Sequence, residues 1–124
     1  MRQSSSIAAV LLCGLVTAVA LRSVPASAAV AAQATEDQIK QGEKVYTAQK
    51  CSLCHSVAGK GNKQNPLDGV GKKLSAEDTR KWITEPDEMT KQSKSTKKPP
   101  MPDKYDKLPT ADLDALVAYM QSLK

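Results

Sequence analysis

The residues with the clearest capacity for chemistry are Cys51, Cys54 and His55, which stand together in the stretch CSLCH. Two thiols separated by two residues and followed at once by the only histidine of the chain are compatible with four kinds of site. These are a disulfide, part of a metal site, a redox-active dithiol and an attachment site for haem. Each makes a different demand on the rest of the sequence.

Three of these sites fit the sequence poorly. A disulfide suits an oxidising compartment, but it would close a loop of two residues and stabilise very little. A thioredoxin-like dithiol belongs at the start of a helix that follows a strand, and no βαβ pattern is present. A zinc site needs further ligands from a second cysteine pair or another histidine, which the sequence does not supply.

Haem attachment explains all three residues of the motif. Each thiol can add to a vinyl group of the haem, and the histidine after the second cysteine then becomes an axial ligand of the iron. We therefore favour covalent haem, with the disulfide and the redox dithiol as the remaining alternatives.

A second axial ligand cannot be histidine, so the soft thioether of methionine is the favoured candidate. Met120 falls on the apolar stripe of a predicted helix, and Met89 stands in the acidic stretch 85–89. Met101 is flanked by three prolines in KPPMP, which restrict the backbone and lower the entropy lost when a side chain is presented to a metal. We predict Met101 as the second ligand; the alternative is a rigid surface turn.

The N-terminus has the pattern of a secretory signal peptide, with Arg2, an apolar run over residues 7–21 and the small residues Ala26-Ser27-Ala28. The apolar run is shorter than the roughly 20 residues of a membrane-spanning helix. We expect cleavage after residue 28. Cleavage after residue 31 is the alternative, because Ala29-Val30-Ala31 also fits the pattern. The expected product is a bacterial periplasmic protein without a membrane span, with a flexible segment 29–35 and a domain over residues 36–124.

The composition argues for a cofactor and against nucleic acid. The 124 residues carry a formal net charge of +5, two units of which belong to Arg2 and Arg22 in the predicted signal peptide. No nucleic-acid-binding motif is present, and one tryptophan and three tyrosines are the only aromatic residues. Small domains with so little aromatic core often depend on a metal or a large cofactor.

Three helical segments and no convincing strand are predicted, which makes the fold class all-α. Thr35 and Gln38 form a capping box for a helix over residues 36–48. Ser75 opens a second helix, which carries Trp82 and should stop at Pro86. The third begins at Thr110 and has the clearest apolar stripe, at positions 113, 116, 117, 120 and 123.

The segments between these helices, residues 56–74 and 84–108, are long for a small domain and are expected to border a binding site. Both are rich in lysine. If they border the haem edge, their lysines could steer an acidic redox partner; the alternative is ordinary solvated loop charge. The lysines concerned are Lys60, Lys63, Lys72 and Lys73 in the first segment and Lys91, Lys94, Lys97 and Lys98 in the second.

The order of these features resembles the class I monohaem cytochromes c from about Asp37 to Leu123. A first helix is followed by CSLCH, a Pro-Leu-x-Gly-Val-Gly segment, a Trp-bearing helix, a Met-Pro loop and a closing Leu-Val-Ala-Tyr-Met helix. The resemblance implies a small all-α fold with three main helices and long loops wrapped around one covalent haem c. It also implies a close crossing of the first and last helices, where Gly42 receives Tyr119.

The resemblance assigns a role to each site residue. Cys51 and Cys54 would form the thioether bonds, with His55 as proximal and Met101 as distal ligand of the iron. Pro66 would offer its backbone carbonyl to the other ring nitrogen of His55, which fixes the tautomer. The segment TKQSKSTKK, residues 90–98, is longer and more basic than is common in the family.

Iron held by protein ligands on both faces has no open position for a substrate, so the expected function is one-electron transport without catalysis. Redox proteins are the expected partners, and acidic docking surfaces on them would suit steering by the lysines. Two alternatives stay open: an electron-accepting cytochrome subunit of a periplasmic dehydrogenase, and a catalytic or gas-sensing haem protein whose methionine ligand can be displaced.

Overall fold

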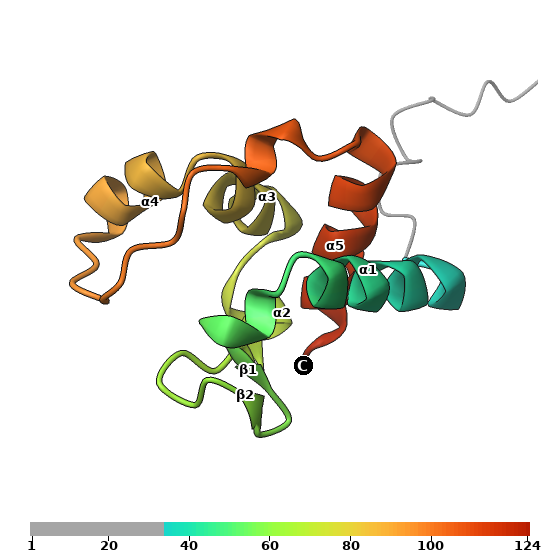
Figure 1. Ribbon diagram of the computed structural model, residues 1–124. Helices are drawn as coiled ribbons and strands as arrows, with labels where there is room; N and C mark the ends of the chain where they lie inside the picture. The colour runs from blue at the N-terminus through green and yellow to red at the C-terminus, as the bar shows by residue number, and fades with distance from the viewer. Residues whose placement is uncertain (1–33) are drawn as a thin grey trace, which may run out of the picture. The chain divides into compact units, whose positions relative to one another are not determined.

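The computed structural model describes residues 34–124, drawn in colour in Figure 1. The predicted signal peptide and most of the segment 29–35 lie outside the described residues. The described part is mostly helical, as predicted, with two very short strands. Its elements in chain order are α1 (Glu36–Ala48), the 3-10 turn η2 (Cys51–Leu53), β1 (Ser56–Val57), β2 (Lys60–Gly61), α2 (Val70–Lys73), α3 (Ala76–Thr84), α4 (Pro86–Ser93), the 3-10 turn η3 (Tyr105–Lys107) and α5 (Thr110–Ser122).

Helix α1 begins where the sequence predicts. The Thr35 hydroxyl accepts a hydrogen bond from the Gln38 amide (3.2 Å), and the Gln38 side chain accepts one from the Thr35 amide (3.0 Å). These bonds satisfy amide groups that have no partner inside the helix. The buried face of α1 consists of Gly42, Val45 and Tyr46.

Helices α1 and α5 cross at Gly42, as the resemblance implied. A Cβ atom at this position would overlap the carbonyl oxygen of Ala115 and lie 2.6 Å from the Cβ atom of Tyr119. The missing side chain therefore lets the two backbones approach closely. One turn further along α1, the rings of Tyr46 and Tyr119 meet edge to face, with centroids 5.7 Å apart.

Helix α5 supplies most of the hydrophobic core. Its predicted apolar stripe is buried at Leu113, Leu116, Val117 and Met120, and Leu123 packs against the same cluster. The helix packs against α1, α2 and α3, so it connects the elements on which the site is built.

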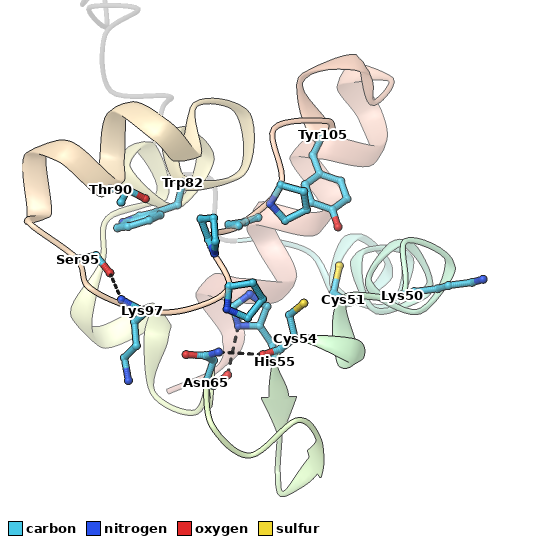
Figure 2. A pocket seen from close by; sticks show the side chains of 14 residues that line it. Lys50, Cys51, Cys54, His55, Asn65, Trp82, Thr90, Ser95, Lys97 and Tyr105 are labelled. Atoms are coloured by element: carbon cyan, nitrogen blue, oxygen red, sulfur yellow. Dashed lines mark hydrogen bonds between the residues drawn. The ribbon is translucent and has the colours of Figure 1, made fainter.

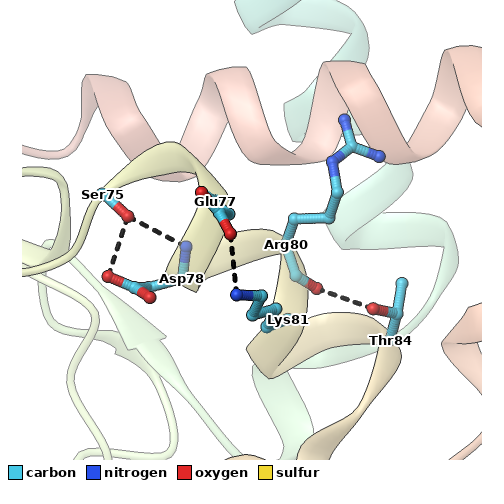
Figure 3. A network of polar contacts seen from close by, with 6 residues as sticks. All are labelled: Ser75, Glu77, Asp78, Arg80, Lys81 and Thr84. Carbon is cyan, nitrogen blue, oxygen red and sulfur yellow. Dashed lines mark hydrogen bonds and ion pairs between the residues drawn. The ribbon is translucent and has the colours of Figure 1, made fainter.

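Helix α3 begins at the predicted cap and is followed by a helix, α4, that was not predicted from the sequence. The Ser75 hydroxyl accepts from the Asp78 amide (3.0 Å), and Lys81 pairs with Glu77 one turn earlier (Figure 3). Pro86 ends α3 as expected, but it is also the first residue of α4. The expected irregular loop over residues 84–108 therefore begins with a helix, because proline fits the first turn, where its missing amide hydrogen has no helical acceptor.

The first long segment, residues 56–74, also contains short regular elements. Ser56 pairs with Gly61 and Val57 with Lys60 in a minimal antiparallel hairpin, and α2 follows further along. At Gly61 the backbone angle φ is +103°, and a Cβ atom there would collide with the carbonyl oxygen of His55. Glycine thus allows the hairpin to pack directly on the CSLCH segment. Within residues 34–124, no helix is both long and apolar enough to cross a bilayer.

Candidate functional site

The two cysteines of CSLCH lie on a tight turn directly after α1. Lys50 reverses the chain with φ +56°, and η2 follows, so that the carbonyl of Cys51 accepts from the amides of Cys54 (3.1 Å) and His55 (2.9 Å). Both cysteines are half-buried free thiols. Burial raises the pKa of the Cys51 thiol, because the thiolate loses solvation.

The imidazole of His55 is held by one main-chain bond. Its Nδ1 atom lies 3.2 Å from the carbonyl oxygen of Asn65, which also accepts from the amide of Ser56 (3.2 Å). A carbonyl can only accept, so Nδ1 carries the hydrogen and Nε2 has the free lone pair. Burial lowers the pKa of His55, with a smaller opposing effect of the Asn65 carbonyl, and the neutral ring that ligates metals is favoured.

This bond corrects the expected role of Pro66. The carbonyl at Nδ1 belongs to Asn65, one residue earlier, and Pro66 itself is exposed. The reason is the short parallel bridge between Ser56 and Pro66. In it, Ser56 donates to Asn65 and accepts from the amide of Leu67 (2.8 Å), so the Asn65 carbonyl is directed toward the CSLCH segment.

Two cavities adjoin this turn and share four lining residues, namely Cys51, His55, Trp82 and Met101. The first has a volume of about 290 Å³ and the second about 230 Å³. Figure 2 shows the first, with Cys51, Cys54 and His55 on one side and Trp82 and Thr90 on the other. Because the same four residues line both, we treat the two cavities as one divided site, called the central site below.

The two parts of the central site differ in character. The wall of the second cavity is mainly apolar, with Leu67, Val70, Leu74, Ile83, Leu116 and Met120. The first has a polar rim that includes Lys50, Asn65, Thr90, Ser95 and Lys97. An apolar interior beside a rim with positive charge matches an extended apolar molecule that carries anionic groups at one edge.

The three methionines of the described region have different environments. Met101 lines both cavities. Met120 is buried in the core, as its helical spacing predicted, and it also borders the second cavity. Met89 is half-buried on α4 and lines neither of them. The structure thus brings Met101 to the same site as Cys51, Cys54 and His55.

Several residues of the central site were not predicted from the sequence as site residues. Trp82 was predicted to lie on a helix but was given no role in the site. As the sole tryptophan on a short amphipathic helix, it could have been recognised as a candidate site residue. Tyr105 of η3 is buried and lines the first cavity, and Thr79 is a buried hydroxyl at the second. The role of Asn65 follows from the path of the backbone around the bridge between Ser56 and Pro66, and no sequence motif specifies that path.

The comparison with protein families identifies the chain. The family model for cytochrome c matches residues 39–124, which is most of the sequence, and the chain belongs to the cytochrome c family. No curated protein and no solved structure matched it. Family membership, together with a site that contains both cysteines and the histidine, makes haem c the cofactor and haem-based electron transfer the general function.

Proposed function

We propose that this protein is a periplasmic one-electron carrier with a single haem c, bound covalently through Cys51 and Cys54 and ligated by His55 and Met101. The observation that carries the proposal is the shared lining of the central site. Met101 comes from the proline-flanked loop after α4, yet it lines the same two cavities as Cys51 and His55.

The residues of the central site fit haem in both donors and walls. A neutral imidazole with Nε2 free and a thioether would be the iron donors of a haem c with histidine and methionine ligands, and the two thiols would attach the porphyrin covalently. The apolar wall suits a porphyrin ring, and the Lys50 and Lys97 side chains at the rim suit its propionate carboxylates. When bound, this haem supplies a one-electron couple between Fe(II) and Fe(III).

The protein's own part is to hold the ligands and exclude water. The Nδ1–H bond of His55 to Asn65 fixes the tautomer and makes Nε2 a stronger donor. The three prolines around Met101 restrict the loop that presents the thioether. Apolar side chains from α3 and α5 limit the access of solvent to the site, which favours rapid electron exchange. Electron transfer of this kind requires no side chain to act as acid, base or nucleophile.

Export follows from the sequence alone in this proposal. The apolar run over residues 7–21 and the small residues before position 29 favour secretion. N-terminal sequencing of secreted protein should find a start at Ala29 or Ala32. A start at Met1 would contradict export by cleavage.

Visible absorption spectra of the exported protein in both oxidation states test the ligand set. We expect low-spin spectra in both states, a sulfur-to-iron band in the oxidised form and no carbon monoxide binding to the reduced form at neutral pH. Binding of carbon monoxide would favour the catalytic or gas-sensing alternative. Stable co-purification with a dehydrogenase would favour the subunit alternative.

A further inference from the structure

Every carbonyl group of the CSLCH turn has a hydrogen-bond partner. The Cys51 carbonyl accepts from amides inside the turn. The carbonyls of residues 52–55 accept from groups further along the chain, and that of His55 also accepts from a side chain of α1. The Asn62 amide donates to the carbonyls of Ser52 and His55 (3.0 Å each), the Asn62 side chain to Leu53 (3.3 Å), the Asn65 side chain to Cys54 (3.3 Å) and the Tyr46 hydroxyl to His55 (3.4 Å).

Asn65 has a place in this set that no other residue shares. Its side-chain amide donates to the carbonyl of Cys54. Its backbone carbonyl accepts from Nδ1 of His55, the residue that follows Cys54 (Figure 2). The residue is thus attached to the turn at two points. A carbonyl oxygen accepts only, which requires the nitrogen of the Asn65 amide to face Cys54.

We propose that Asn65 is a positioning residue for His55: its side-chain bond to Cys54 holds its backbone carbonyl against Nδ1–H and so sets the donor strength of the ligand. The inference rests on the proposed haem ligation. Without the side-chain bond, the Asn65 carbonyl would keep the Ser56 amide as its one other donor, and the segment would still be held by the bond from the Leu67 amide to Ser56. The carbonyl would then move more freely, and the Nδ1–H bond would weaken.

A weaker Nδ1–H bond has a defined electronic consequence. Hydrogen bonding at Nδ1 makes Nε2 more basic toward a metal, and a more basic ligand stabilises the oxidised iron more than the reduced iron. Loss of the Asn65 side chain should therefore shift the midpoint potential in the positive direction. A purely structural role would lower stability without that shift.

Asn62 provides a matched control in the same loop. It is half-buried like Asn65 and makes an equivalent bond of 3.3 Å to the turn, whereas the hydrogen bond of the His55 ring goes to Asn65. Each replacement by alanine removes one such bond, and Asn62→Ala also removes the bond that Oδ1 of Asn62 accepts from the Gln64 amide (3.0 Å). We expect the unfolding equilibrium constant to rise roughly fivefold in Asn65→Ala, which corresponds to one hydrogen bond, and at least as much in Asn62→Ala.

The experiment compares the haem-loaded wild type with Asn65→Ala and Asn62→Ala at fixed pH. The midpoint potential is measured by redox titration, and hydrogen exchange at Nδ1 of His55 by NMR on the reduced protein. Of the two alanine variants, only Asn65→Ala should shift the potential in the positive direction and exchange this hydrogen roughly fivefold faster. Asn65→Leu, which keeps most of the volume and lacks the donor, is measured alongside as a second test and should behave like Asn65→Ala.

The outcomes separate this inference from the proposed function. Haem-loaded Asn65 variants with unchanged potential and unchanged exchange would overturn the inference alone, as would equal shifts in Asn62→Ala. A wild-type protein without covalent haem would overturn the proposed function and, with it, this inference.

Discussion

Gly42 of α1 lies directly against the main chain of Ala115 in α5, with no room for a side chain between them. We therefore expect Gly42→Ala to force the two helices apart. Overpacking of this kind costs about 1–3 kcal/mol, which the better helix propensity of alanine offsets only in part. The free energy of unfolding, measured by chemical denaturation, should fall by about 1–2 kcal/mol.

A control for this prediction is Lys44→Ala, at an exposed position of the same helix. Its effect should stay within about 0.5 kcal/mol of the wild type. Equal stability of Gly42→Ala and Lys44→Ala would mean that the helix crossing tolerates a methyl group.

The axial ligand can be tested with two methionines that line the same cavity. Met101→Leu and Met120→Leu each replace a thioether by a hydrocarbon of similar volume. Met120→Leu should cost less than about 1.5 kcal/mol in stability, whereas Met101→Leu also loses the proposed bond to iron and should cost more. Only Met101→Leu should abolish the sulfur-to-iron absorption band, while the haem remains attached. A band that survives in Met101→Leu and disappears in Met120→Leu would transfer the ligand role to Met120.

The polar contact between α3 and α5 should stabilise the fold whether or not haem is bound. The side-chain amide of Gln121 donates to the hydroxyl of Thr79 (2.8 Å) and to the carbonyl of Leu74 (3.2 Å). Thr79 is only 3% exposed, so Gln121→Ala would leave a buried hydroxyl with one partner fewer. We expect a loss of about 1–3 kcal/mol by thermal or chemical denaturation.

The second change in this pair is Thr79→Val, which removes the hydroxyl. Added to Gln121→Ala, it should cost less than it does alone, because the two residues share one bond. Fully additive effects would show that the contact contributes nothing of its own.

The lysines of the two long segments should differ in their effect on electron transfer. Lys97 lines the first cavity of the central site. Lys60 instead lines a separate cavity of about 410 Å³ between α1 and the hairpin, together with Tyr46 and Tyr119. If the positive charge beside the central site steers anions, Lys94→Gln with Lys97→Gln should lower the rate of oxidation by hexacyanoferrate(III) at low salt roughly threefold to tenfold.

The matched pair Lys60→Gln with Lys63→Gln removes the same charge from the other segment and should have a smaller effect. Added salt should slow the wild type and reduce the difference between the variants. If the rates do not respond to salt, the lysines are ordinary solvated charge and steering is excluded.

The fold was predictable wherever local chemistry determines it. The capping residues Thr35 and Ser75 and the stripe of α5 specify helix starts and a buried face within a few residues of sequence. The three predicted helices are found at their expected positions, but α2 and α4 were not predicted. The end of α3 before Pro86 was predicted, but the start of α4 at Pro86 was not. Proline disfavours helix in the residues before it and fits the first turn of a helix that follows. The two-residue strands are too short to show an alternating pattern, and the turn between them, with φ +48° at Ala58 and +75° at Gly59, offers one glycine as its sequence signal.

The candidate site was predictable to the extent that chemistry is carried by residue type and spacing. CSLCH and the prolines around Met101 are visible in the sequence, and the structure brings them to one site. The carbonyl that bonds Nδ1 of His55 was predicted to be that of Pro66, one residue after Asn65. Which of the two carbonyls faces the ring depends on the bridge between Ser56 and Pro66, which the sequence does not specify. The apolar wall combines side chains of α3, α5 and residues 67–74, which only tertiary packing brings together.

The central claim is that Cys51 and Cys54 carry one covalently bound haem. Intact-mass spectrometry of protein exported from a host with cytochrome c maturation machinery tests it most directly, together with a haem stain after denaturing electrophoresis. We predict the mass of the processed polypeptide plus one haem and a stained band that is lost in Cys51→Ala, Cys54→Ala. A colourless wild-type protein with the mass of its amino acids alone would contradict the account.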